Sequence, residues 1–214
     1  MPHDHPDHGG ISPSGHPYRP DQDGPLTEAQ ALEIAVRELL IEKGIVTAGE
    51  IAAAIARMDA RSPAVGARIV ARAWTDPAFK ARLLADGSAA AREMGADIDA
   101  LKLVVVENTP DTHNAIVCTL CSCYPRTLLG LPPDWYKSRE YRSRMVREPR
   151  RVLAEFGLHL PPNVRVRVHD STADMRYIVL PARPAGTEGW SEEQLAAIVT
   201  RDCMIGVAVP RLPG

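Results

Sequence analysis

Three cysteines crowded into six residues constrain this chain more than any other feature of its sequence. Cys118, Cys121 and Cys123 lie in one short segment, whereas the fourth cysteine, Cys203, lies far downstream. Thiols this few and this clustered cannot form the disulfide framework of a small secreted protein, so in a cytosolic chain they indicate metal binding or redox chemistry. Cys203 is expected to be a buried thiol without a ligand role.

The spacing of the cluster disfavours a structural zinc site. Such sites usually draw two pairs of ligands from opposite ends of a loop, and no second pair is present here. If the backbone amides of Ser122 and Cys123 deprotonate, their nitrogens and the sulfurs of Cys121 and Cys123 close fused chelate rings, which brings four donors toward one plane. Cys118 can then reach an axial position, and one coordination position stays open. Trivalent cobalt or iron, or divalent nickel or copper, suit such a donor set.

The charge of this donor set requires nearby cations. Three thiolates and two amidates carry about −5, so a trivalent ion leaves about −2, which buried surroundings must offset. Arg126 follows the cluster closely and is the local candidate, although a solvated surface arginine would look the same. Other cations could come from a partner chain.

Composition places most of the chain in the soluble, globular class. It has 214 residues with 45% hydrophobic and 24% charged residues, and its formal net charge is −2. No run approaches the roughly 18 apolar residues of a membrane span, and the start has no apolar targeting region, so we expect a cytoplasmic protein without membrane contact. The balanced charge gives no reason to bind nucleic acid. The basic run from Lys137 to Arg151 is interpreted as a subunit-interface face.

The segment before Leu101 is predicted to be a disordered tail followed by helices. Residues 1–25 are rich in His, Pro, Asp and Gly and hold almost no apolar side chain, so they cannot offset the entropy of ordering. Capping boxes begin at Thr27 and Thr47, and two further helices are expected from Ser62-Pro63 and Asp76-Pro77. The first two helices have thin apolar faces. We therefore expect residues 26–100 to lie partly across a partner or the later domain.

Strands and helices alternate irregularly after this point, which indicates an α+β fold. Strands are expected at 103–106, 114–117 and 164–168, and one at 177–180 should pair with 164–168 across the turn at Asp170-Ser171. Helices are expected over 139–155, with an interruption at Pro149, and after a capping box at Ser191. A last strand is expected over 204–209. His113 is interpreted as a loop residue that caps a turn.

The cysteine segment and its surroundings resemble the nitrile hydratase α subunit. The shared segments extend from about Leu26 to Val209; they are Cys118-Thr119-Leu120-Cys121-Ser122-Cys123, Val105-Val106-Glu107-Asn108-Thr109-Pro110, Gly130-Leu131-Pro132-Pro133-Asp134-Trp135-Tyr136-Lys137, Val146-Arg147-Glu148-Pro149-Arg150, Arg176-Tyr177 and Arg183-Pro184-Ala185-Gly186-Thr187-Glu188-Gly189. The resemblance implies an N-terminal helical arm, residues 26–100, that wraps a β subunit. It also implies a layered α-β-β-α catalytic domain, residues 101–214, that carries a metal claw loop.

The same resemblance implies a cofactor and an activity. The metal would be non-corrin cobalt(III), or iron(III) as the alternative, bound by the sulfurs of Cys118, Cys121 and Cys123 and by the amide nitrogens of Ser122 and Cys123. Cys121 would be a sulfinic acid and Cys123 a sulfenic acid, and these two would be the catalytic residues. The threonine at position 119 is similar to the cobalt variant of the family, because the iron variant typically has Ser at this position. The implied reaction is hydration of a small nitrile to an amide in an αβ heterodimer, or in a heterotetramer of two such pairs.

Two other functions remain open. Tyr124-Pro125-Arg126 and Thr200-Arg201-Asp202-Cys203 resemble the metal subunit of thiocyanate hydrolase, a sister enzyme that shares the metal site. A non-enzymatic alternative is an interaction module with a zinc or redox cysteine knot. That alternative predicts colourless protein, tetrahedral zinc and no oxidised sulfur.

Overall fold

The computed structural model describes residues 25–96, 98 and 101–213. The expected tail over 1–25 lies almost entirely outside these residues. The chain divides into two compact units, with the boundary between Arg57 and Met58.

The first unit contains helix α1 (Glu28–Glu42) and most of helix α2 (Ala48–Asp59). Both predicted capping boxes are confirmed. Thr27 Oγ1 accepts a hydrogen bond from Gln30 N, whose side chain accepts one from Thr27 N, and Thr47 and Glu50 repeat this reciprocal pair. Neither helix has a buried residue, so its apolar positions, such as Leu32 and Ile55, are exposed.

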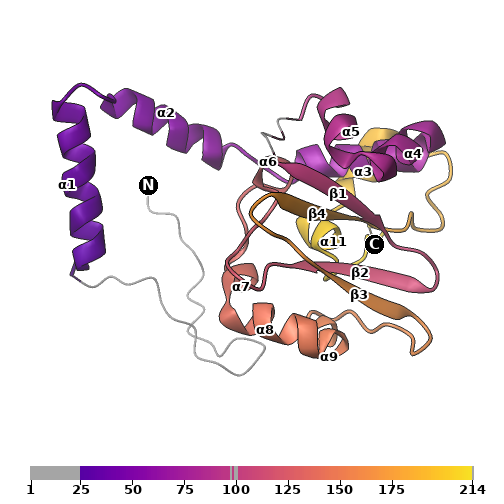
Figure 1. The fold of residues 1–214 in the computed structure, drawn as a ribbon. Helices are drawn as coiled ribbons and strands as arrows, with labels where there is room; N and C mark the ends of the chain where they lie inside the picture. The colour runs from indigo at the N-terminus through magenta and orange to yellow at the C-terminus, as the bar shows by residue number, and fades with distance from the viewer. Residues whose placement is uncertain (1–24, 97, 99–100, 214) are drawn as a thin grey trace. The chain divides into compact units, whose positions relative to one another are not determined.

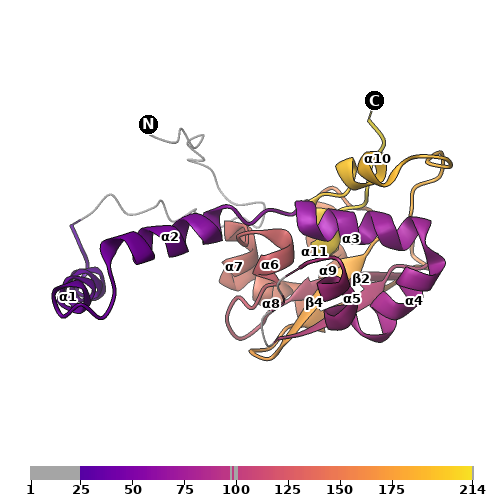
Figure 2. The ribbon, with the colours of Figure 1, turned by 90° about the horizontal axis from the view of Figure 1, so that it is seen from above.

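The second unit begins with three helices, of which the second and third pack on a strand. They are α3 (Ala64–Thr75), α4 (Pro77–Ala85) and α5 (Gly87–Glu93). Asp76 caps α4 through a bond from Phe79 N, as predicted. At Gly87 a Cβ atom would lie 2.7 Å from Leu103 O, so only glycine lets α5 approach strand β1 (Lys102–Glu107) this closely. The helices thereby cover the strand (Figures 1 and 2).

The strands form two parallel pairs. β1 pairs with β4 (Met175–Leu180), and β2 (Thr112–Val117) pairs with β3 (Arg165–Asp170). The predicted hairpin between 164–168 and 177–180 is therefore wrong, because the chain leaves β3 and enters a different sheet (Figure 1). Burial explains why β4 pairs with β1 and not with β3. The apolar residues Ile178 and Leu180 of β4 pack into the core beside Leu103 and Val105 of β1, and β3 is half exposed.

Six short helices complete the second unit: α6 (Arg126–Leu129), α7 (Asp134–Lys137), α8 (Arg139–Arg147), α9 (Pro149–Glu155), α10 (Glu192–Ala197) and α11 (Arg201–Ile205). The predicted break at Pro149 and the capping box at Ser191 are confirmed. The strand expected over 204–209 is wrong. Thr200 caps α11 instead, and Gly206 ends it with a φ of 89°.

Helices and strands together confirm the mixed α and β class of the chain. Among the residues that the structure describes, no helix combines the length and apolar content needed to cross a bilayer.

Candidate metal centre

The cysteine segment forms a loop at the end of β2, and the end of β3 holds its first residues. Ser171 N donates to Val117 O at 2.7 Å, which extends the pairing of the two strands by one step. Thr119 then donates to the Asp170 carboxylate twice, from its backbone nitrogen at 2.9 Å and from its hydroxyl at 2.5 Å. The loop therefore leaves the sheet in a fixed direction.

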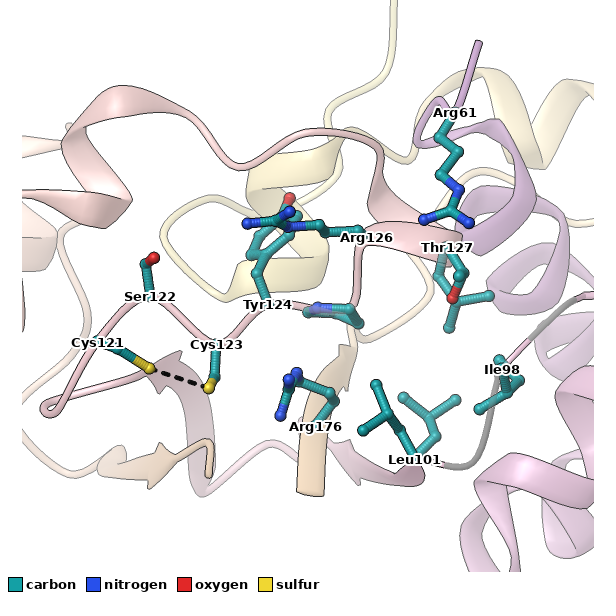
Figure 3. Close-up of a pocket in the computed structure, with 13 residues that line it drawn as sticks. Arg61, Ile98, Leu101, Cys121, Ser122, Cys123, Tyr124, Arg126, Thr127 and Arg176 are labelled. Carbon is teal, nitrogen blue, oxygen red and sulfur yellow. Dashed lines mark hydrogen bonds between the residues drawn. The ribbon is translucent and has the colours of Figure 1, made fainter. Parts of the chain in front are cut away.

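The loop brings three sulfurs into one cluster. Cys118 Sγ lies 3.5 Å from Cys121 Sγ, and Cys121 Sγ lies 3.1 Å from Cys123 Sγ. All three atoms lie within 4.8 Å of one another. Cys118 is buried and Cys121 is exposed, so the cluster reaches from the core to the surface. Figure 3 shows the Cys121 and Cys123 sulfurs facing each other.

The backbone of the loop is held by several hydrogen bonds. Cys121 N donates to Cys118 Sγ at 3.3 Å. The carbonyls on either side of Ser122 are bound as well: Tyr136 Oη donates to Cys123 O at 3.0 Å, and Arg142 Nη1 donates to Cys121 O at 2.6 Å. These contacts fix the main chain that carries the Ser122 and Cys123 nitrogens.

The thiols of Cys121 and Cys123 differ in acidity. Hydrogen bonds from Cys123 and Cys118, with help from the backbone amides, lower the pKa of Cys121 to about 7. Burial and the bond to Cys121 raise the pKa of Cys123 to about 12, although the charge of Arg176 acts in the opposite direction. A bound cation must displace the thiol protons, because metals bind the thiolate.

A cavity of about 310 Å³ adjoins the cluster. Cys121, Ser122 and Cys123 form one side, and the guanidinium-bearing residues Arg126 and Arg176 lie in its wall. In Figure 3 both arginines lie on the same side of Cys123, with Arg126 above Arg176. Arg176 is anchored through its Nη1 by the carbonyls of Thr172 and Ala173, whereas Arg126 is exposed at the start of α6.

Comparison with known proteins identifies the family. The family described as nitrile hydratase, alpha chain, matches residues 27–208 of this chain. The chain belongs to the nitrile hydratase alpha-chain family.

Three relatives show how close this membership is. The low-molecular weight cobalt-containing nitrile hydratase subunit alpha of Rhodococcus rhodochrous is 53% identical over 181 residues, which cover 84% of this chain and 87% of that protein. The thiocyanate hydrolase subunit gamma of Thiobacillus thioparus is 48% identical over 201 residues, covering 88% and 82%. A solved structure of the Fe-type nitrile hydratase from Comamonas testosteroni Ni1, a double mutant, matches with a TM-score of 0.82 and 47% identity over 88% of this chain and 97% of that one.

In this nitrile hydratase family member, the residues singled out from sequence fall in three places. Cys118, Cys121, Ser122 and Cys123 come together in the loop. Arg126 lies in the cavity wall beside them. Thr119 faces away from the sulfurs toward Asp170 and anchors the loop.

Sequence reasoning missed several residues that hold the loop. Arg142 was grouped with an interface face, yet its side chain binds Cys121 O. Asp170, Tyr136 and Arg176 also contact the loop or the cavity; Tyr136 and Arg176 lie in segments that carried the family resemblance, and Asp170 does not. Their separation from the cysteines in sequence leaves no local signal.

The interpretation of His113 as a loop residue is wrong. It lies in β2 with 4% of its surface exposed. Its Nε2 lies 2.8 Å from Gly206 O, and Asn108 Nδ2 lies 3.3 Å from its Nδ1. Because burial disfavours the charged ring, the pKa of His113 is lowered. The histidine is therefore part of the core.

Proposed function

We propose that this chain is the α subunit of a nitrile hydratase, which adds water to a nitrile to give an amide. The observation that carries the proposal is the cluster of three sulfurs within 4.8 Å in one loop, in a chain that matches the nitrile hydratase alpha-chain family. Close relatives named as cobalt-containing support cobalt(III), with iron(III) as the alternative.

The cofactor would be held by the sulfurs of Cys118, Cys121 and Cys123 and by the backbone nitrogens of Ser122 and Cys123. The hydrogen bonds that hold the Cys121 and Cys123 carbonyls fix the main chain between them, which supports this donor set. When bound, a trivalent ion supplies Lewis acidity that polarises the nitrile carbon toward attack.

The chain's own residues supply the proton transfer and the orientation. We assign Cys121 as a sulfinic acid and Cys123 as a sulfenic acid, as the resemblance to the nitrile hydratase α subunit implies; a bound metal keeps both sulfurs deprotonated and so open to oxidation. The oxygen on Cys123 would attack the nitrile carbon or take the proton of an attacking water. Tyr136 and Arg142 hold the carbonyls of Cys123 and Cys121, which fixes the loop while the proton moves. Arg126 and Arg176 offset the negative charge of the donor set.

The proposed assembly is an αβ heterodimer or a heterotetramer of such pairs, in the cytoplasm. We assign the helical region over residues 26–100 to contact with the β subunit. The exposed apolar side chains of α1, which include Leu32, Val36 and Leu39, support this assignment because an isolated helix with that face would bury it in a partner. The layered α-β-β-α order of the catalytic domain belongs to the same proposal.

A second candidate function is thiocyanate hydrolysis. The 48% identity to a thiocyanate hydrolase gamma subunit favours it, as does Arg126, which places a cation in the cavity wall that an anionic substrate would need. The two candidates share the metal centre. A companion gene count separates them: one partner subunit for nitrile hydratase and two for thiocyanate hydrolase.

The test is turnover by the chain purified with its partner. We expect conversion of propionitrile to propionamide, with less than about 1% of that rate after Cys123→Ala, since the catalytic oxygen is then lost. Cys203→Ala is the matched control because that thiol is buried away from the loop, and it should stay active. Conversion of thiocyanate without conversion of nitriles would contradict the proposal, as would an active Cys123→Ala.

A further inference from the structure

The cavity beside the cysteine loop has three arginines in its wall. Only two of them are needed to offset the charge of the metal donor set. Arg126 and Arg176 lie near Cys123, and Arg61 lies at the other end, next to Thr127 (Figure 3). Within the described part of the chain, no Asp or Glu lines this cavity. The described residues that line the cavity therefore give it three positive side chains and no negative one.

Arg61 is held at this position by its backbone. It lies between α2 and α3, and its carbonyl oxygen would be 2.8 Å from a Cβ atom on Gly130. Gly130 in turn donates from its backbone to Arg126 O at the end of α6. The main chain of Arg61 is thus packed against the short helix that carries Arg126, so the two arginines keep a fixed relation.

The side chains of Arg61 and Arg126 are free to take a ligand. Neither forms a hydrogen bond or ion pair with another side chain or carbonyl in the described ranges, in contrast to Arg144, which binds Glu148 and Glu155. Arg61 is only partly exposed. A guanidinium in a partly enclosed cavity interacts more strongly with an anion than one on an open surface.

Part of the remaining wall is apolar. Leu101, Leu103 and Leu128 line the cavity together with Ile98. Such a surface suits a short methylene chain rather than a second polar group. A volume of about 310 Å³ suits a small molecule of a few carbon atoms.

We propose that this cavity makes the enzyme selective for small anionic nitriles, namely cyano-carboxylates. The nitrile group lies at the cysteine loop, the methylene chain lies on the leucines, and the carboxylate binds Arg61. Water adds across the carbon–nitrogen triple bond and gives the amide, while the carboxylate takes no part in the reaction. This inference rests on the proposed nitrile hydration and names its substrate class.

The three arginines carry more positive charge than the metal donor set of Cys118, Cys121, Ser122 and Cys123 needs for neutralisation. The donor set leaves about −2 with a trivalent ion, which Arg126 and Arg176 can offset from beside Cys123. Among the described residues that line the cavity, Arg61 at the far end remains in excess. One excess guanidinium matches one carboxylate.

The test compares a length series with neutral nitriles. Cyanoacetate, 3-cyanopropionate and 4-cyanobutyrate are measured beside butyronitrile on the chain purified with its partner. We expect one of the three anions to exceed butyronitrile in kcat/KM by at least about tenfold, the size of one hydrogen bond to a charged group. The ratio for that anion relative to butyronitrile should fall about tenfold in Arg61→Gln and recover in part in Arg61→Lys. Arg68→Gln, an exposed arginine of α3 outside the cavity, should keep the wild-type ratio.

A second readout does not depend on turnover. Metal-free protein is titrated with 3-cyanopropionate by calorimetry, and we expect binding that weakens as salt rises and is lost in Arg61→Gln. If butyronitrile is hydrated but no anion is preferred and Arg61→Gln leaves the ratio unchanged, the substrate class is wrong while the proposed function stands. If neither neutral nor anionic nitriles are converted, the proposed function itself fails.

Discussion

Asp170, the last residue of β3, holds Thr119 through both its backbone nitrogen and its hydroxyl, at 2.9 Å and 2.5 Å. Thr119 directly follows Cys118, so this carboxylate fixes the direction in which the cysteine loop leaves β2. A strand that provides no sulfur thereby determines where the sulfurs lie.

Removing this carboxylate should loosen the loop and reduce metal binding. In Asp170→Ala both bonds to Thr119 are lost, which costs about 2 kcal/mol for bonds to a charged acceptor. We expect the cobalt bound per chain to fall several-fold and the melting temperature to drop by about 4–8 °C. Metal analysis and thermal unfolding measure both effects. Asp174→Ala, an exposed carboxylate in the next turn, is the control and should change neither. Full cobalt occupancy in Asp170→Ala would show that the loop holds its shape without β3.

Gly206 should tolerate no side chain, for two reasons: its positive φ and the lack of space for a Cβ atom. Gly157 shares only the first reason and serves as the comparison. Both Gly206 and Gly157 have positive φ, at 89° and 78°, so alanine costs about 1–2 kcal/mol at either position. At Gly206 a Cβ atom would also lie 2.1 Å from Asn114 O, whereas nothing lies within 4 Å at Gly157. We expect Gly206→Ala to destabilise the protein by at least about 3 kcal/mol in urea unfolding and Gly157→Ala by about 1–2 kcal/mol. Equal losses would mean that α11 can move away from β2.

Buried His113 should make stability depend on pH. Burial lowers the pKa of His113 below its ordinary value of 6.5, so the unfolded chain takes up the proton first as pH falls. The stabilising contribution is therefore complete above pH 6.5 and is lost as pH drops below it, by up to about 1.4 kcal/mol per pH unit. In His113→Gln, urea unfolding between pH 7.5 and 5.5 should show a shallower fall than in the wild type. His169, whose pKa is also lowered by burial, keeps part of the slope. An unchanged slope would exclude His113 as its source.

Local signals in the sequence predicted the local structure well. The capping boxes at Thr27, Thr47 and Ser191 and the break at Pro149 each depend on residues within one turn, and each is confirmed. The cysteine loop could be predicted for the same reason, since its donors lie within six residues.

Signals that depend on distant partners were missed. The alternation of apolar and polar residues in 164–168 indicated a half-buried strand. Nothing in that segment predicts that β3 pairs with β2 and not with β4, the next strand along the chain. The apolar run from Met204 resembled a strand, although the cap at Thr200 and the left-handed Gly206 enclose a helix. Asp170 and Arg142 contact the loop from distant positions, so only the fold brings them there.

The identity and oxidation of the ligands test the central claim most directly. Purified holoprotein is examined by X-ray absorption at the metal edge and by intact mass. The account predicts one cobalt(III) per chain bound by both sulfur and nitrogen, with about three added oxygens on Cys121 and Cys123. A tetrahedral zinc bound by side chains alone, or a chain with no metal and no added oxygen, would contradict it.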